Sequence, residues 1–451
     1  MSRLDFGAHY SFCNFYIMSN HIHTTWGKDF SHESLGSLMG FVDTDIVVIG
    51  GGMAGMLAAY ALSESGKKIV LIEKGKIGGG ATVATTAFLT QIIDTDYQDI
   101  VNSLGTETAA QVAASHKHAI DTIEKIISQE SIDCEWKRVP NYVYAQNDHG
   151  VEILKKECEA QKEAGISSEW KEDLDLGFEN KGAIEVSHQA KFNPGKFITG
   201  LGRVLRDRGV LIFENTSAIA MEEKGQKKLV TATNGHTESH ITSNWVIVTT
   251  YEPFMRPLRL YFKKAFYTSY VYELEFPHES LVEGLYEDNA NPYHYFRVDR
   301  MEDRDRVIIG GEDHRSDLHV SEEKCFKSLM KYVKSTFKNL PFAITHQWKG
   351  PILEPVDGLP FIGQFRDHNT LYAMAFSGNG MTYSMISAQI FKDHIEGKKN
   401  QYADLYQADR MPYLKLLMLK GRDYTEEFFG GAVKNSLGQN KTLRKLRHIL
   451  E

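Results

Sequence analysis

The chain has 451 residues, of which 42% are hydrophobic and 24% charged, and its formal net charge is −8. This length predicts two or three domains, and the acidic balance argues against a nucleic-acid-binding protein. The 4 cysteines include no Cys-x-x-Cys pair, which gives no support for a metal site, a redox dithiol or a disulfide framework. We therefore expect a cytoplasmic protein without a bound metal.

Residues 1–39 are expected to form an extension before the first domain. Their apolar patch, Phe12–Met18, is short and interrupted by Asn14, and no convincing cleavage site follows it, so a signal peptide is disfavoured. Met18 is an alternative start of the protein. No apolar run in the chain approaches the ~18 residues of a membrane-spanning helix.

The first domain is predicted to open with a strand, a glycine-rich turn and a helix. Residues 46–49 form a β-branched run that is typical of a buried parallel strand. Residues 53–65 are rich in Met, Leu and Ala and contain no Pro, which predicts a helix that ends at Gly66. A second β-branched strand is predicted at residues 69–72, so the segment has the order of a βαβ unit.

The turn between the first strand and the helix matches the GxGxxG pattern. The first glycine of this pattern allows a tight turn, the second lets the backbone approach a pyrophosphate, and the third lets the helix pack closely on the strand. Glu73 closes the second strand, near the expected distance of about 20 residues from the turn, where a carboxylate accepts hydrogen bonds from ribose hydroxyls. The dinucleotide-binding residues predicted here are Gly50, Gly52, Met53, Ala54, Gly55, Glu73 and Lys74.

A second glycine-rich segment favours FAD over NAD as the cofactor. Gly78–Gly80 come shortly after the acidic residue and lead into small and hydroxyl side chains. Such a segment suits the ribityl chain and the ring edge of a long extended cofactor, whereas NAD-binding domains usually continue with another βα unit. The contacts predicted here are Gly79, Gly80, Ala81, Thr82, Thr85 and Thr86.

A further cofactor signal lies between Leu353 and Ser384. Residues 371–384 predict a strand, a Ser-Gly-Asn-Gly turn and a helix that continues to about Ile395. Backbone N–H groups at the start of such a helix stabilise the negative charge that develops on a reduced flavin. The contacts predicted here are Gly363, Gly378, Asn379, Gly380, Met381 and Thr382.

Together these stretches resemble the D-amino-acid oxidase-like (DAO) superfamily of FAD-dependent oxidoreductases. The resemblance covers residues 26–410 and is closest to bacterial members that are often fused to a C-terminal Rieske iron–sulfur domain. It implies Ala218 and Thr249 as further FAD contacts. The stretches that carry it include DIVVIGGGMAGMLAAYAL at 45–62, GGGATVATTAFLTQ at 78–91, VIIGGEDH at 307–314, WKGPILEPVDGLPFIG at 348–363 and SGNGMTYS at 377–384.

The chain departs from the fused members in its cysteines. A Rieske cluster needs paired Cys-x-His and Cys-x-x-His ligands, and no cysteine here has a histidine two or three positions later. Electrons would therefore pass to O2 or to a separate acceptor.

The resemblance implies an α/β fold of two interleaved domains and a tail. A Rossmann-like FAD-binding domain of the glutathione-reductase type would alternate with an α+β substrate domain built on a mostly antiparallel sheet. The expected ranges are 40–95, 186–255 and 345–398 for the FAD-binding domain, 96–185 and 256–344 for the substrate domain, and 399–451 for a helical tail.

By the same resemblance, the protein would oxidise the C–N bond of a small amine or amino acid by hydride transfer to flavin N5. One alternative is a flavin dehydrogenase that passes electrons to a separate carrier. Another is a flavin-binding protein with little turnover of its own. The tail from Met411 is basic and has apolar positions at helical spacing, and we favour its packing on its own domain over contact with a membrane.

The candidates on the substrate side are four catalytic residues and three further ones. Arg297 would hold a substrate carboxylate or form a structural ion pair, with equal weight. Lys264 would assist flavin reoxidation or lie in a surface turn, which we favour because lysines are mostly exposed. The full set is Arg297, Lys264, His314 and Tyr295 as catalytic candidates, with Tyr251, Tyr293 and Trp348 beside them.

Two of these assignments have plain structural alternatives. His314 would face the flavin or merely cap its loop. Tyr293 and Tyr295 alternate on an expected strand and would line a substrate site or belong to an ordinary core.

Overall fold

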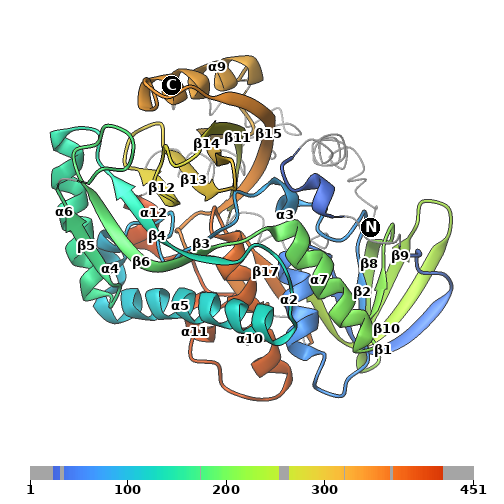
Figure 1. Cartoon of the computed structure of the whole chain (residues 1–451). Helices are drawn as coiled ribbons and strands as arrows, with labels where there is room; N and C mark the ends of the chain where they lie inside the picture. The colour runs from blue at the N-terminus through green and yellow to red at the C-terminus, as the bar shows by residue number, and fades with distance from the viewer. Residues whose placement is uncertain are drawn as a thin grey trace, which may run out of the picture.

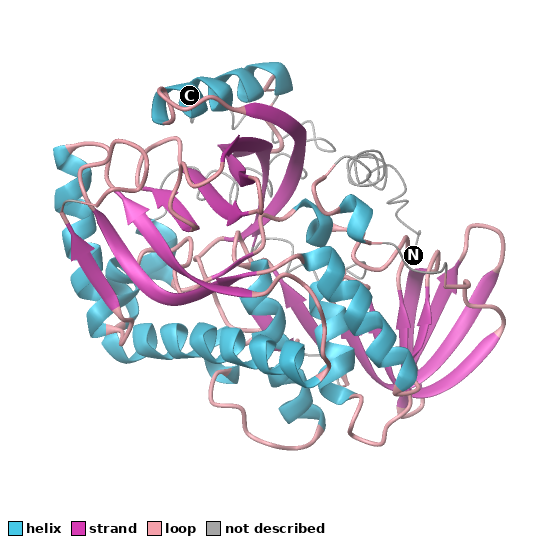
Figure 2. Ribbon diagram, viewed as in Figure 1, coloured by secondary structure: helices cyan, strands magenta, loops and turns pink. Residues whose placement is uncertain are grey.

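The computed structural model describes residues 24–30, 35–172, 174–252, 264–318, 320–365 and 369–419. It is built on two large sheets with helices around them (Figures 1 and 2). The strands of the first sheet are β1 (Phe41–Ile49), β2 (Ile69–Ile72), β7 (Leu211–Phe213), β8 (Ser217–Lys224), β9 (Lys227–Thr233), β10 (Glu238–Val248), β16 (Phe361–Gln364) and β17 (Thr370–Met374).

The second sheet collects strands from the middle of the chain. They are β3 (Phe88–Leu89), β4 (Lys137–Tyr144), β5 (Ser168–Lys171), β6 (Ala183–Lys191), β11 (Lys264–Pro277), β12 (Gly284–Asp288), β13 (His294–Arg300), β14 (Arg304–Arg315) and β15 (Ala343–Pro355). The helices are η2 (Gly27–Asp29), α2 (Met53–Leu62), α3 (Ala81–Ala84), α4 (Tyr97–Leu104), α5 (Thr106–Gln129), α6 (Asp148–Glu163), α7 (Pro194–Asp207), α9 (Glu322–Thr336), α10 (Gly380–Ile395), α11 (Ala403–Tyr406) and α12 (Leu414–Leu419).

The first sheet is a Rossmann-like parallel sheet at its centre. Strands β17, β10, β1, β2 and β7 lie side by side and parallel, and β16 and β9 join antiparallel. Apolar side chains alternate between its two faces, as a buried parallel sheet requires. One face packs against α2, α10, α7 and α5, and the other is covered by the β8–β9 hairpin.

The second sheet is mostly antiparallel, in the order β15-β11-β14-β13-β12-β4-β6-β3, with β12 and β4 parallel to each other. One face carries an aromatic core that includes Tyr286 and Phe296 and is covered by α9 through Leu329 and Val333. The opposite face turns towards the glycine-rich segments of the first domain, because Trp348 and Val83 share a small core there. The expected α/β fold class, with a Rossmann-like domain and a mostly antiparallel second sheet, is confirmed.

In the sequence, Asn193 followed by Pro194 is typical of a helix start, and the structure has one there, while the helix predicted at residues 53–65 is shorter than expected. Asn193 caps α7, its side chain accepting hydrogen bonds from the N–H groups of Gly195 and Lys196, and Pro194 occupies the first turn. Helix α2 ends at Leu62, before the expected residue 65, because the hydroxyls of Ser63 and Ser65 bond back to carbonyls of the last turn.

Both ends of the described chain differ from the simple picture of an extension and a tail. Trp26, inside the expected extension, is fully buried between the domains and donates its indole N–H to the Thr85 carbonyl at 2.7 Å. In the tail, Leu416 of α12 is buried and Leu414 is exposed. The rest of the predicted amphipathic tail lies outside the described residues, as do residues 1–23.

The two sheets do not divide at the expected domain boundaries. Strand β15 pairs with β11 in the second sheet, although the expected FAD-binding segment begins at residue 345. Strand β6 likewise pairs with β4, although another such segment begins at residue 186. These boundaries stay predictions, while the pairing shows that residues 343–355 belong to the second sheet.

Candidate FAD and substrate site

Four predicted cofactor segments meet at one edge of the first sheet. Gly50, Glu73, Thr249 and Ala375 each follow the carboxyl end of a parallel strand, namely β1, β2, β10 and β17. Strand β1 lies between β2 on one side and β10 on the other, so the strand order changes direction at β1. Ligands of open α/β sheets bind outside the carboxyl ends of the strands at such a point. The helices that start there, α2 and α10, pack side by side (Figure 1).

The glycine-rich turn is as tight as the GxGxxG pattern requires. Gly50 has a φ of 111°, and a Cβ on it would lie 2.6 Å from the Thr249 carbonyl oxygen. A Cβ on Gly55 would lie 1.8 Å from the Gly50 carbonyl oxygen, so α2 packs directly on the end of β1. A Cβ on Gly52 would lie 3.3 Å from the Thr82 hydroxyl, a tight approach, so the start of α2 lies close against the second glycine-rich segment.

Glu73 is held by the backbone on both of its oxygens. Its carboxylate accepts hydrogen bonds from Gly51 N–H at 2.7 Å and from Gly75 N–H at 2.8 Å. Burial raises the pKa of Glu73, and these two donors oppose the rise. Each oxygen keeps a lone pair for a further donor, as a ribose hydroxyl would supply. The neighbouring Lys74 side chain is exposed.

The second glycine segment closes over the start of α2. Gly80 precedes α3, and a Cβ there would meet nothing within 4 Å. The hydroxyl of Thr82 accepts a hydrogen bond from Met53 N–H at 3.0 Å and so ties α3 to the first turn of α2. Gly79 donates its N–H to the Lys76 carbonyl. Ala54, Ala81, Thr85 and Thr86 are all partly exposed in this region.

The turn before α10 has a strained backbone and is held by hydrogen bonds. Ala375 and Ser377 have positive φ values of 59° and 52°, which non-glycine residues adopt only when the surroundings impose them. Asp94 imposes part of this geometry by accepting hydrogen bonds from Ser377 Oγ and from Gly378 N–H, the latter at 2.7 Å. Asn379 donates from its side chain to the Ile92 carbonyl at 3.0 Å.

These residues fit an extended dinucleotide such as FAD. Cβ atoms built on Gly80, Gly363 and Gly380 would all meet open space, and α2 and α10 both present N-terminal N–H groups at this edge. Met381 and Thr382 are buried in the first turn of α10 and shape its inner side. Ala218 lies partly exposed on β8, at the other end of the predicted path.

The face of the second sheet that is turned towards this edge carries neighbouring polar side chains, which begin with Glu287 and Tyr295 and which we call the polar row. Glu287 of β12 pairs with Tyr295 of β13, which pairs with Gly310 of β14. Directly paired residues of neighbouring strands share one face of a sheet. A Cβ on Gly310 would lie 2.5 Å from the Tyr295 ring, so the missing side chain makes room for this ring. The Tyr295 hydroxyl is hydrogen-bonded to Ser269 Oγ at 2.9 Å.

A β-bulge in β14 brings a second carboxylate to the row. Glu312 and Asp313 together lie opposite the single residue Ser269, and Glu312 has a positive φ of 57°. Burial, followed by the charges of neighbouring carboxylates, raises the pKa of Asp313 to about 7. Burial, and after it the charge of Asp94, raises the pKa of Glu287 to about 7.

Comparison with known proteins agrees with this geometry. The model of the family described as FAD dependent oxidoreductase, DAO, matches residues 45–394. The chain belongs to the DAO family. It is accordingly an FAD-dependent oxidoreductase and an enzyme with FAD as its cofactor.

Individual relatives of this DAO chain are distant but nearly full-length. A protein of Bacillus subtilis (strain 168) named as a Rieske 2Fe-2S iron-sulfur protein, YhfW, is 26% identical and covers 91% of this chain and 81% of its own length. The glycine oxidase of Bacillus licheniformis is 24% identical and covers 81% of this chain and 97% of its own length. The solved structure of L-amino acid deaminase from Proteus vulgaris superposes with a TM-score of 0.69 at 16% identity, covering 85% of this chain and 100% of its own.

In this DAO chain Arg297 forms a structural ion pair. Its guanidinium is buried and bonds to Asp299 at 2.8 Å and to the carbonyls of Thr86 and Phe192, both at 3.0 Å. All three guanidinium nitrogens bond to protein groups, so the expected structural ion pair is present, while a role in holding a substrate carboxylate stays a prediction. Through its hydrogen bond to the Thr86 carbonyl, Arg297 supports the second glycine-rich segment, which is predicted to contact the flavin.

Lys264 also differs from the favoured interpretation. It is buried at the start of β11, bonded to Glu252 at 2.5 Å and packed over the Phe266 ring at 4.4 Å, so the expected surface turn is wrong. The interpretation failed because the contacting residues come from another segment of the chain. Whether Lys264 assists flavin reoxidation stays a prediction.

Three further candidates lie in different surroundings. His314 packs edge-on against Tyr270, and burial lowers the pKa of its imidazole. Trp348 is buried and donates its indole N–H to the Ala84 carbonyl at 2.9 Å, which makes it a support for α3. Tyr251 follows β10 with a positive φ of 65°, close to the edge where the cofactor segments meet.

Sequence reasoning missed the acidic part of the site. Asp94, Glu287, Asp313 and Asn141 come from four separate segments, and although Asp313 lies in the VIIGGEDH stretch, nothing in these segments marked the four as one site. One available signal was the position of Asp313, directly after the Gly310-Gly311 pair, because paired glycines in a strand often mark a bulge or a close approach.

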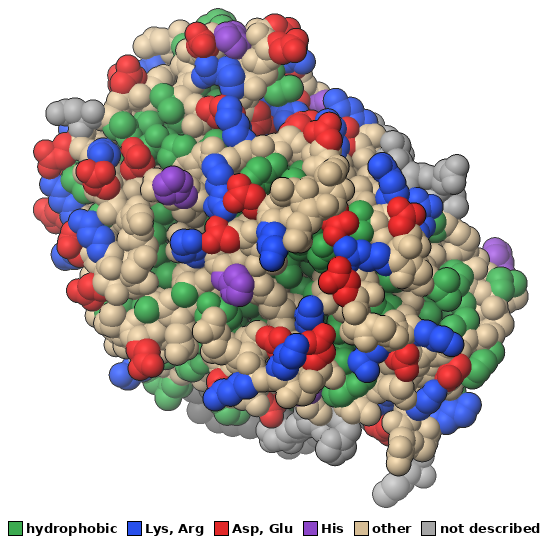
Figure 3. Space-filling view, turned by 60° about the horizontal axis from the view of Figure 1, so that its bottom comes forward, with side chains coloured by type: hydrophobic (Ala, Val, Ile, Leu, Met, Phe, Trp, Pro, Cys, Tyr) green, Lys and Arg blue, Asp and Glu red, His purple; other side chains and the backbone are tan. Residues whose placement is uncertain are grey.

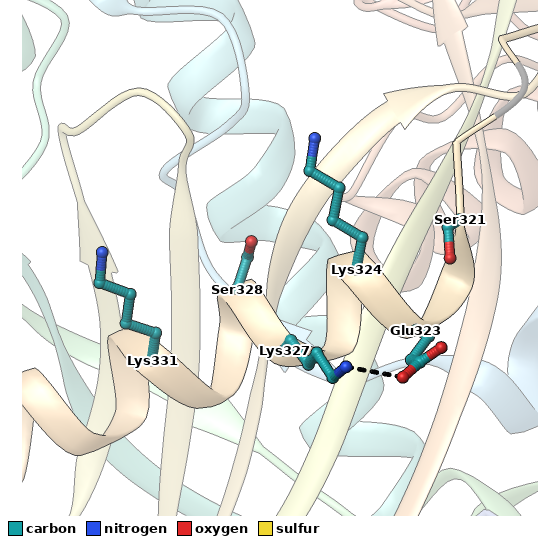
Figure 4. A pocket seen from close by; sticks show the side chains of 6 residues that line it. All are labelled: Ser321, Glu323, Lys324, Lys327, Ser328 and Lys331. Carbon is teal, nitrogen blue, oxygen red and sulfur yellow. Dashed lines mark ion pairs between the residues drawn. The ribbon is translucent and has the colours of Figure 1, made fainter.

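Other surface features of the described chain lie away from this site. A hollow on the outer side of α9, lined by lysines such as Lys324 and Lys331, opens to solvent, and Lys327 there pairs with Glu323 (Figure 4). Acidic and basic side chains are intermixed over the face shown in Figure 3. Among the described helices, none is both long and apolar enough to cross a bilayer.

Proposed function

We propose that this DAO-family enzyme oxidises the carbon–nitrogen bond of a small amine or amino acid. The observation that carries the proposal is the position of Asp94. It holds the turn before α10, and its charge also acts on Glu287 and Asp313 in the polar row. A substrate beside these carboxyls would therefore lie next to the cofactor edge. Two relatives, named as a glycine oxidase and a gamma-glutamylputrescine oxidoreductase, agree with this substrate class.

The reaction needs a hydride acceptor and a proton acceptor. When bound, FAD supplies the acceptor for the hydride that leaves the carbon beside the nitrogen, and the nitrogen lone pair then forms the C=N bond. Water hydrolyses the resulting imine to a carbonyl compound and an amine or ammonia. No nucleophilic side chain is required for these steps.

The carboxyls of the polar row suit the proton transfer. An ammonium group must lose a proton before its neighbouring C–H can give up a hydride. A carboxylate with a pKa near neutrality is a good acceptor for that proton at physiological pH. Glu287 and Asp313 both have a pKa of about 7, and Glu287 accepts a hydrogen bond from the Tyr293 hydroxyl at 3.1 Å, which orients one oxygen.

The test is an anaerobic titration of the purified, flavin-loaded enzyme with a panel of amines, amino acids and hydroxy acids. Bleaching of the visible flavin absorption by an amine or amino acid would support the proposal. Bleaching by hydroxy acids alone would contradict it. Admission of O2 to the reduced enzyme then tests the acceptor, since slow reoxidation would favour a separate electron carrier, the second function considered from the sequence.

A further inference from the structure

Two tyrosine rings and two carboxyls form one surface beside the cofactor edge. The rings of Tyr293 and Tyr295 are stacked with centroids 5.6 Å apart. Tyr293 donates its hydroxyl to Glu287 at 3.1 Å, and Tyr295 reaches Asp313 through the hydroxyl of Ser269. Electron-rich ring faces next to carboxyls are the surroundings that organic ammonium groups prefer.

This surface is short of positive charge among the described residues. The principal charged neighbours of Glu287 are Asp94 and Asp96, and those of Asp313 are Glu354 and Asp94, with His294 as its basic neighbour. Arg297 lies on the same face, but its guanidinium is bonded to Asp299 and to two backbone carbonyls. A substrate carboxylate would meet like charges here, which is unfavourable in a buried site.

Two buried polar groups at this surface have acceptor or donor capacity left. Asn141 is fully buried beside Glu287, and neither of its amide atoms has a hydrogen-bond partner of normal geometry among the described residues. Oδ1 of Asp313 is buried and likewise without a partner in the described chain. Buried polar atoms are normally satisfied, so two orphans on one face of the sheet indicate a ligand or ordered water.

We propose that the substrate is a cationic alkylamine without a carboxylate, of the diamine or polyamine class, held between Glu287, Asp313 and the stacked tyrosines. This inference rests on the proposed function and narrows its substrate class. One ammonium group supplies three donors, which match the carboxylate oxygens and the amide oxygen of Asn141. Asp94 adds a further negative charge, which a second ammonium group would help to neutralise.

The test is equilibrium binding to the flavin-loaded enzyme by calorimetry, with three ligands of equal chain length. Putrescine carries two ammonium groups, butylamine carries one, and 4-aminobutanoate carries one ammonium group and has a carboxylate as its fourth carbon. At about pH 8, where the carboxyls are ionised, we expect putrescine to bind about tenfold tighter than butylamine and butylamine about tenfold tighter than 4-aminobutanoate. Equal or tighter binding of 4-aminobutanoate than of butylamine would overturn the inference.

Variants show whether the binding belongs to this surface. Glu287→Gln should weaken putrescine binding about tenfold or more, while Glu302→Gln, at an exposed carboxylate of the β13–β14 loop, should leave it unchanged. If Glu287→Gln loses FAD, Asp313→Asn replaces it in the same comparison. Unchanged putrescine affinity in a flavin-loaded Glu287 or Asp313 variant would refute the assignment.

The outcome separates this inference from the proposed function. Binding of putrescine that depends on Glu287, with no bleaching of the flavin by any amine or amino acid, would support the site and refute the oxidation. Bleaching by amino acids, together with unhindered binding of 4-aminobutanoate, would support the oxidation and refute the cationic site.

Discussion

Replacement of Gly55 by alanine should destabilise this enzyme, although alanine is the better helix former. In an exposed helix the change would stabilise by about 1 kcal/mol. In α2, however, the new Cβ would lie 1.8 Å from the Gly50 carbonyl oxygen and 2.8 Å from the Thr249 hydroxyl. Real Cβ atoms essentially never approach another heavy atom closer than 3.0 Å, so α2 would have to move away from β1.

The expected magnitude follows from these opposing effects. The obstructing atom is a backbone oxygen at the end of a buried strand, which cannot rotate away as a side chain would. Overpacking of a well-packed core costs about 1–3 kcal/mol, and this contact belongs at the upper end of the range. After the gain in helix propensity, we expect a net loss of about 2 kcal/mol in the free energy of unfolding. The displaced start of α2 should also weaken FAD binding about tenfold or more.

The assay is urea unfolding of the apoprotein, combined with FAD binding followed by flavin fluorescence. Gly36→Ala is the matched control, because a Cβ at Gly36 meets nothing within 4 Å. A Gly55→Ala protein that is more stable than the parent by about 1 kcal/mol would show that propensity alone decides, and the argument from close packing would be refuted.

Three further predictions concern the buried charges and the packing between the domains. Asp299→Asn should lower the free energy of unfolding by about 3–5 kcal/mol, because it leaves Arg297 buried without its counter-charge. A loss below about 1 kcal/mol in urea unfolding would contradict this. Putrescine affinity should rise about tenfold from about pH 6 to about pH 8, because Glu287 and Asp313 each have a pKa of about 7 and become charged as the pH rises through that value. A flat calorimetric profile would argue against their role. Trp348→Phe should cost about 1 kcal/mol of stability through the lost hydrogen bond to α3, which thermal unfolding can measure, and an unchanged midpoint would show that this bond contributes nothing.

The cofactor part of the site was accessible from the sequence because its signals are local. A positive φ at Gly50 and a Cβ-free position at Gly55 are requirements on a few adjacent residues. Each leaves a direct mark in the residue types. The order of strand, turn, helix and strand then identified the βαβ unit before any tertiary contact was known.

The roles of the charged residues were decided only by the tertiary structure. Arg297 and Lys264 have the same residue types whether they bind a substrate or a neighbouring carboxylate, and the sequence left both roles open for each. Asp299 lies two residues from Arg297 on the same strand, but the carbonyls of Thr86 and Phe192 reach Arg297 only through chain packing, as Glu252 reaches Lys264.

The acidic surface depends on the same kind of long-range pairing. Glu287, Asp313 and Asn141 stand on three different strands, and the strand order β14-β13-β12-β4 brings them to one face. The bulge opposite Ser269 then directs Asp313 into the row. Thus the sequence by itself determined the cofactor and the family, because backbone geometry is encoded locally. The surroundings of a substrate arise from strand order and register, and these only the folded structure decided.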